Sequence, residues 1–117
     1  MRSTESDGAV PVHWIYLAVA GAFEIGFTAC LKMSEGFTRL WWTLAFVVSA
    51  AVSFLFLNLA MEAIPLGTSY AIWTGIGAAG TAVVGMVAFK EPVTVVRIAL
   101  ISLLIAAVVG LKFVSVE

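Results

Sequence analysis

An acidic residue lies in the middle of the first long apolar segment of the chain. Glu24 follows about ten residues after the beginning of a run from His13 to Met33, which in a helix places it about 15 Å deep, near the midplane of a bilayer. No other Asp, Glu, Lys, Arg or His lies so deep in an apolar run. An ionised carboxylate at that depth is costly unless a cation or a water-filled cavity compensates it. Glu24 can therefore hold a proton or a cationic substrate and exchange one for the other; a structural carboxyl bonded to a neighbouring helix is the alternative.

Polar and aromatic residues at helical spacing surround this position. Gly21 and Phe27 lie three residues before and after the glutamate, on its helical face, and are expected to line a pocket. Ser53 lies in the middle of the second apolar run and can reach the carboxylate across a helix interface. Tyr70 and Trp73 share one face of the third run, where aromatic rings with polar tips can hold a cation and hydrogen-bond a carboxylate. Plain packing, or anchoring of Tyr70 at the membrane interface, is the alternative for this pair.

The third apolar run also contains a glycine-rich segment. Residues 75–80 read Gly-Ile-Gly-Ala-Ala-Gly, which matches the dinucleotide-binding fingerprint letter for letter. No strand is expected before the segment and no acid follows about 20 residues later, so the fingerprint lacks its context. Glycines in a membrane helix more often allow close packing or a bend. We therefore expect a hinge at Gly75 and Gly77.

The chain offers little for catalysis or metal binding. It has no serine–histidine–acid set, no phosphate loop and no cluster of metal ligands, and its only cysteine, Cys30, excludes an intrachain disulfide. Its six Lys and Arg and its net charge of −1 exclude the concentrated basic surface that nucleic acids require. We expect no enzyme activity, no metal site and no nucleic-acid partner.

The composition indicates a membrane protein. Of the 117 residues, 62% are hydrophobic and 11% are charged, and the mean hydropathy is +1.11. A soluble core of this size cannot hide so much apolar surface, so the excess must face lipid. Four apolar runs are each near the roughly 20 residues that cross a bilayer core of about 30 Å. They cover about residues 13–33, 42–61, 66–89 and 94–114.

These runs predict an all-α membrane protein with four transmembrane helices. The connections are short, so neighbouring helices are expected to be antiparallel. Residues 1–12 are polar, contain Gly8 and Pro11 and show no apolar helical pattern. A disordered tail is therefore expected before a four-helix transmembrane domain over residues 13–117.

A second copy of the chain is expected to complete the molecule. Four helices enclose too little volume for a water-accessible pathway with a sealed far side. Ser102, Ala106 and Gly110 recur every four residues in the fourth run, a stripe of small residues that favours helix association. The basic residues divide two against four between the two membrane sides, a bias small enough to permit insertion in both orientations. We expect a dimer held partly by the fourth helix.

Together, these residues resemble the small multidrug resistance family of proton-coupled exporters, over nearly all of the chain from Trp14 to Lys112. The matching pieces are Glu24, Leu31-Lys32, Gly36-Phe37-Thr38-Arg39-Leu40 and Pro65-x-Gly67-x-x-Tyr70-Ala71-Ile72-Trp73. Within the family, two further pieces are similar to the guanidinium-exporter branch: Trp73-Thr74-Gly75-Ile76-Gly77-Ala78 and Gly110-Leu111-Lys112.

The resemblance implies an antiparallel homodimer, inserted in the plasma membrane in both orientations, that exchanges protons for cations at paired glutamates. It implies a substrate and proton site at Glu24, Ser53, Tyr70 and Trp73, with the proton gradient as driving force and no cofactor. Phe27 departs from the pattern, because the guanidinium branch commonly has a tryptophan there whose N–H supports the glutamate. This departure predicts tolerance of bulkier guanidino compounds such as guanylurea.

The leading interpretation is therefore a proton-coupled antiporter that exports guanidinium-type cations, namely guanidinium, guanylurea or other substituted guanidinium compounds. An exporter of quaternary ammonium or other lipophilic cations is the nearest alternative. A non-transporting assembly or regulatory subunit is an alternative of another class, which an acid at the midplane and aromatic residues at helical spacing disfavour. A heterodimer with a paralogue stays open, since one sequence cannot name its partner.

Overall fold

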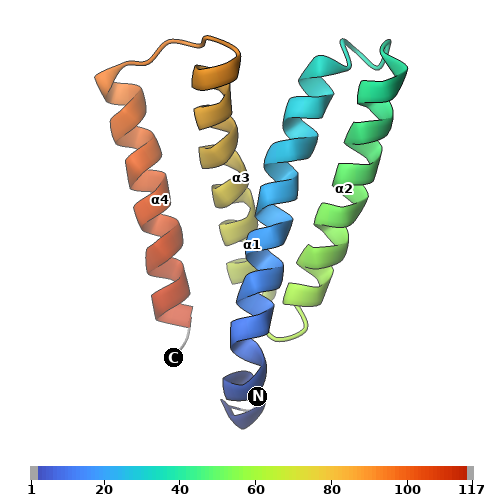
Figure 1. The fold of residues 1–117 in the computed structure, drawn as a ribbon. Helices are drawn as coiled ribbons and strands as arrows, with labels where there is room; N and C mark the ends of the chain where they lie inside the picture. Colours follow the sequence, from blue (N-terminus) through green and yellow to red (C-terminus); the bar gives the residue numbers. More distant parts are fainter. Residues whose placement is uncertain (1–2, 116–117) are drawn as a thin grey trace.

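The computed structural model describes residues 3–115, with the side chains of residues 11–114. In this part of the chain four helices follow one another: α1 (Ser3–Met33), α2 (Leu40–Ala60), α3 (Leu66–Ala88) and α4 (Val95–Ser115) (Figure 1). Each contains a stretch long and apolar enough to cross a membrane. The predicted all-α fold with four membrane-spanning helices is confirmed.

The helix boundaries agree with the predicted runs within two residues, except at the N-terminus. There α1 begins at Ser3, ten residues before the predicted start. The disordered tail predicted for residues 1–12, of which residues 1 and 2 lie outside the described part, stays a prediction. Pro11 lies inside the helix, where it removes one backbone hydrogen bond. Extending an existing helix is much easier than nucleating one, so the long span from Pro11 to Met33 can continue toward the N-terminus despite the proline.

Helix α1 lies at the centre of the packing. It contacts both α2 and α3, whereas α4 packs on α3 and stands apart from α2 (Figure 1). The buried core lies where α1, α2 and α3 meet, and comprises Leu17, Ala20, Leu57, Ala60, Ile64, Ile72 and Trp73. No described side chain of α4 is buried, although its span is the most apolar of the four. In a membrane, the exposed faces of α4 must therefore meet lipid or another copy of the chain.

The connection from α3 to α4 folds back against α3. Lys90 adopts a left-handed backbone conformation with φ 58°, and the N–H of Glu91 donates to the carbonyl oxygen of Gly85 at 3.0 Å. At the start of α4, the N–H of Arg97 donates to the Thr94 hydroxyl at 3.1 Å, which caps the first turn. The connection thereby places an acid and a base, Glu91 and Arg97, beside the last turns of α3.

Candidate functional site

Glu24 projects from α1 toward a glycine of α3. A Cβ atom built on Gly77 would overlap the Glu24 carboxylate, so the missing side chain at position 77 makes room for the acid. Glu24 is partly buried, and its Oε1 atom is buried without a hydrogen-bond partner among the described residues. A buried polar atom without a partner is costly. This position therefore suits an acid whose partner comes from outside the chain, either a proton or a cation.

A cavity of about 400 Å³ opens at this carboxylate, between α1, α3 and the start of α4. Small and hydroxyl side chains line it together with three charged ones; the lining residues are Glu24, Thr28, Gly77, Ala78, Thr81, Ala82, Glu91 and Arg97. The Thr81 hydroxyl is buried and unpaired within the described residues. In the same part of the chain, no group of three or more His, Cys, Asp or Glu is placed to hold a metal ion. The size of the cavity and its two acids suit a small polar cation.

A chain of buried hydrogen bonds joins α1, α2 and α3 one turn from Glu24. The indole N–H of Trp73 donates to the Ser53 hydroxyl at 2.9 Å, and that hydroxyl donates to the carbonyl oxygen of Ala20 at 2.6 Å. The sequence predicts that Ser53 reaches the Glu24 carboxylate. In the protomer the single hydroxyl proton of Ser53 is instead used on the α1 backbone, so Ser53 and Trp73 fix the helices around the acid and do not bond to it.

Phe27, Tyr70 and Trp73 belong to one aromatic cluster, which lies outside the carboxylate cavity. Ring centroids are 5.7 Å apart for Tyr70 and Trp73, and 5.6 Å apart for Phe54 and Trp73. The Phe27 ring lies 6.0 Å from Phe54 and 5.9 Å from Phe46. Tyr70 is 57% exposed. Among the described residues, none of these rings lines the carboxylate cavity, so the chain does not bring all the predicted site residues together.

The glycines predicted to line the pocket or to form a hinge are points of close helix approach. A Cβ atom at Gly21 would lie 2.6 Å from Cγ2 of Ile76, so Gly21 lets α1 approach α3 and does not line the carboxylate cavity. A Cβ atom at Gly75 would overlap Val108 of α4. Helix α3 is continuous through Gly75 and Gly77, and a hinge at these two positions stays a prediction.

Ser102, Ala106 and Gly110 lie on the outer side of α4. All three are exposed, and among the described residues a Cβ atom at Gly110 would have no neighbour within 4 Å. Val108, which packs against α3 and the core, lies on the opposite side of the helix. The stripe is therefore available to a second copy, and its role as a dimer interface stays a prediction.

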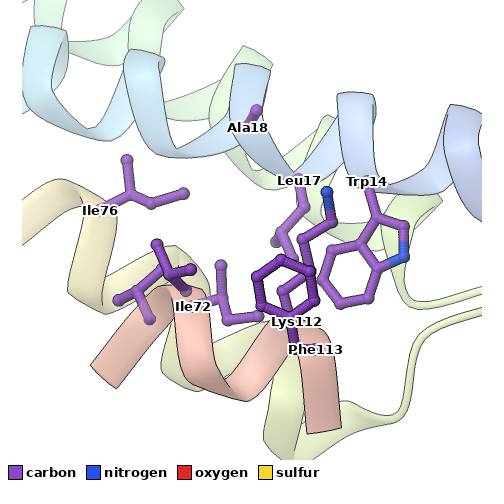
Figure 2. A pocket seen from close by; sticks show the side chains of 9 residues that line it. Trp14, Leu17, Ala18, Ile72, Ile76, Lys112 and Phe113 are labelled. Atoms are coloured by element: carbon purple, nitrogen blue, oxygen red, sulfur yellow. The ribbon is translucent and has the colours of Figure 1, made fainter. Parts of the chain in front are cut away.

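A second cavity, of about 290 Å³, lies between α1, α3 and α4 (Figure 2). Its lining is apolar apart from one ammonium and one indole group, and comprises Trp14, Leu17, Ala18, Ile72, Ile76, Val108, Val109, Lys112 and Phe113. Nζ of Lys112 lies 5.7 Å from the centroid of the Trp14 ring, within the range of a cation–π interaction. With a cation and no acid in its lining, this cavity does not suit a cationic substrate.

Sequence reasoning missed Thr81, Glu91 and Arg97 as parts of the carboxylate cavity. It treats Arg97 only as a charge near the membrane surface, and it does not single out Glu91. The available signal was an acid within the third connection and a base six residues later, at the start of α4. Phe54 was missed too, although it directly follows Ser53 in an apolar run.

Comparison with known proteins identifies the family to which the chain belongs. The sequence profile of the family described as "Small Multidrug Resistance protein" matches residues 12–104. The guanidinium exporter of Yersinia pseudotuberculosis is 43% identical over 102 residues, which cover 87% of this chain and 98% of that protein. The guanidinium exporter of Proteus vulgaris is 42% identical over 104 residues, which cover 89% of this chain and 100% of that protein.

A Bacillus subtilis protein named probable guanidinium efflux system subunit GdnD is 41% identical over 104 residues, which cover 89% of this chain and 99% of that protein. The residues matched by the family profile cover the first three spans and the first half of α4, and this range contains position 24. These matches confirm the resemblance that the residues suggested. The chain belongs to the small multidrug resistance family and is a multi-pass protein of the plasma membrane.

Proposed function

We propose that this chain is a proton-coupled antiporter that exports guanidinium-type cations, such as guanidinium, guanylurea or other substituted guanidinium compounds, across the plasma membrane. The observation that carries the proposal is the Glu24 carboxylate. It lies in the middle of a membrane span, one of its oxygens is buried and unpaired among the described residues, and it lines a cavity of about 400 Å³. Relatives named guanidinium exporters, which match nearly the whole chain, support this class of substrate.

A single carboxylate can couple the movement of protons in one direction to the movement of the cation in the other. A proton and a cation compete for the same carboxylate, so an arriving cation displaces the proton, and a proton arriving from the other side displaces the cation. A guanidinium ion is planar and presents its N–H groups in a fork that fits the two oxygens of a carboxylate. In this proposal the proton gradient supplies the driving force, no cofactor takes part and no covalent bond other than that of the proton changes.

The proposed functional unit is a dimer of antiparallel copies, either a homodimer or a pair with a paralogue. Two features support a second copy. The small residues Ser102, Ala106 and Gly110 are exposed on α4, none of whose side chains is buried up to residue 114, and the Tyr70 ring is exposed. The carboxylate cavity of one protomer lacks its predicted aromatic partners. A second copy can bring its own Tyr70 to this cavity and supply the second Glu24.

Transport by the purified protein in proteoliposomes tests the proposal. Vesicles that are acidic inside should take up guanidinium and release protons. Glu24→Gln should reduce the rate to that of empty vesicles, because an amide can neither bind the cation electrostatically nor carry the proton. Glu62→Gln is the matched control, since Glu62 is exposed in the turn between α2 and α3, and it should keep the wild-type rate. Uptake by Glu24→Gln at the wild-type rate would refute the proposal.

Export of quaternary ammonium or other lipophilic cations is the second candidate. The aromatic cluster of Phe27, Phe54, Tyr70 and Trp73 favours it, because aromatic faces can hold a cation that has no N–H donor. The same vesicles distinguish the candidates, since faster exchange of tetraethylammonium than of guanidinium favours the second. If the purified chain exchanges neither ion, both transport candidates fail. The chain is then a non-transporting subunit or one half of a heterodimer.

A further inference from the structure

Helix α3 presents a row of small residues between two carboxylates. Gly77 lies against the carboxylate of Glu24, and Gly85 lies against that of Glu91, so that a Cβ atom at either glycine would overlap the acid beside it. The two glycines are eight residues apart, which is about 12 Å along a helix. Between them Ala78, Thr81 and Ala82 line the same cavity. Only small side chains of α3 therefore line the cavity between one acid and the other.

The second acid already holds a guanidinium group. Nη2 of Arg97 donates to Oε1 of Glu91 at 2.6 Å, and the two side chains are 34% and 41% exposed. Both ends of the pair are anchored by the backbone, through the N–H of Glu91 on Gly85 and the N–H of Arg97 on Thr94. A guanidinium–carboxylate pair thus forms within the cavity that contains Glu24, in a protein whose relatives are named guanidinium exporters.

We propose that Glu91 is a second binding site for guanidinium-type substrates, at the loop end of the cavity, where the substrate replaces the guanidinium group of Arg97 before it moves to Glu24. The proposal rests on the proposed function. Arg97 acts as a tethered competitor that covers Glu91 when no substrate is bound. The unpaired hydroxyl of Thr81 lies between the two acids and offers an oxygen acceptor to the N–H groups of the ion in transit.

Arg97 and the substrate can compete for Glu91 on similar terms, because both bind through a guanidinium group. The two groups make the same charge-assisted hydrogen bonds with a carboxylate, so their intrinsic affinities are similar. A group tethered by a short flexible linker has an effective concentration of about millimolar, and free substrate at comparable concentration can therefore displace it. Because the pair is partly exposed, exchange does not require a buried charge to be left without a partner.

The proposal predicts effects of opposite sign for the two members of the ion pair. Glu91→Gln removes the site and should raise the KM for guanidinium about threefold to tenfold. Arg97→Gln removes the competitor and should lower the KM about threefold. The double variant should behave like Glu91→Gln, because without the carboxylate the competitor has nothing to cover. The KM is measured from initial rates of proton-driven guanidinium uptake in proteoliposomes.

Two control variants separate this mechanism from a general effect of charge. Lys90→Gln removes a neighbouring exposed cation that does not line the cavity. Glu35→Gln removes the acid of the exposed Glu35–Arg39 pair, whose atoms lie 3.4 Å apart in another connection. Both variants should keep the wild-type KM. A fall in KM for Lys90→Gln equal to that for Arg97→Gln would overturn the proposal, because it would make the effect one of net charge.

A purely structural ion pair gives a different pattern. It would make both single variants less stable and shift the KM in the same direction or not at all, which overturns the proposal. If Glu91→Gln does not fold, Arg97→Gln alone decides, because an unchanged or higher KM contradicts competition. Wild-type protein that moves no guanidinium refutes the proposed function itself. If the wild-type protein transports guanidinium and the Glu91 and Arg97 variants have the wild-type KM, only the site at Glu91 is refuted.

Discussion

Gly77 of α3 and Glu24 of α1 face each other so closely that a Cβ atom at position 77 would overlap the carboxylate. The acid at mid-span is accommodated by the absence of a side chain on the neighbouring helix. Gly21 and Ile76, about one turn away, make a similar close approach between the same two helices. The position of the carboxylate therefore depends on the register between α1 and α3.

Gly77→Ala should displace the Glu24 carboxylate and reduce guanidinium transport about tenfold or more. Adding a methyl group to a filled interface costs about 1–3 kcal/mol, although alanine is the better helix former. Initial rates of uptake in proteoliposomes measure the effect. Gly67→Ala is the matched control on α3, because a Cβ atom there would meet nothing within 4 Å among the described residues. Equal rates for the two variants would contradict the role assigned to Gly77.

The Trp73–Ser53 hydrogen bond should contribute about 0.5–2 kcal/mol to stability, the range measured for hydrogen bonds between membrane helices. A double-mutant cycle with Ser53→Ala and Trp73→Phe isolates this bond, using denaturation in detergent micelles. Ser53→Ala should also weaken the anchoring of α2 on the Ala20 carbonyl. Thr74→Val serves as the control, since within residues 3–115 the Thr74 hydroxyl bonds only to carbonyls of its own helix. Additive effects of the two substitutions would show that the bond contributes nothing.

Ala106→Leu should weaken dimer formation, because a larger side chain on the small-residue stripe of α4 prevents close approach of two helices. The dimer fraction can be followed by energy transfer between labelled copies in liposomes. Ala51→Leu adds the same volume to an exposed position of α2 and should leave the dimer fraction unchanged. Loss of association in Ala51→Leu but not in Ala106→Leu would place the interface elsewhere.

Phe27→Trp should narrow the substrate range toward plain guanidinium. An indole at this position keeps the aromatic contacts with Phe46 and Phe54 and adds an N–H donor, which can brace a carboxylate. The wild-type protein, with phenylalanine, should transport guanylurea and guanidinium at more similar rates than the variant does. The ratio of the two initial rates is the measurement, and an unchanged ratio contradicts a role of Phe27 in selectivity.

The four spans follow from the sequence because crossing a bilayer requires a long apolar helix. Such a run is visible without any knowledge of packing. The start of α1 is less visible, since the polar residues before His13 and the proline at position 11 oppose a helix that nevertheless continues to Ser3. The family and the functional role of the midplane acid could also be predicted from the sequence, because an unpaired acid inside an apolar run has few structural roles.

The partners of the site residues were harder to predict. Ser53 was expected at the carboxylate, but its hydroxyl proton goes to Ala20, since the rotation of α2 about its axis is set by packing against α1 and not by sequence spacing. Glu91 and Arg97 come together because Lys90 turns left-handed and the chain folds back onto Gly85. A non-glycine residue with positive φ is uncommon, so this turn could not be read from the residue types.

The hydrogen bonds through Ser53 join α1, α2 and α3. Helix α4 meets these helices through apolar contacts such as that of Val108 with the helix face at Gly75, and through the cation–π contact of Lys112 with Trp14. Its Arg97 pairs with Glu91 of the preceding connection. Helices α1, α2 and α3 are therefore joined to one another by buried polar contacts that α4, in the part that the structure describes, does not share. If two copies join through α4, the two α4 helices would remain fixed while the three other helices of each copy rock around them. The two parts would then move against each other at Gly75, where the absence of a side chain lets α3 roll over α4.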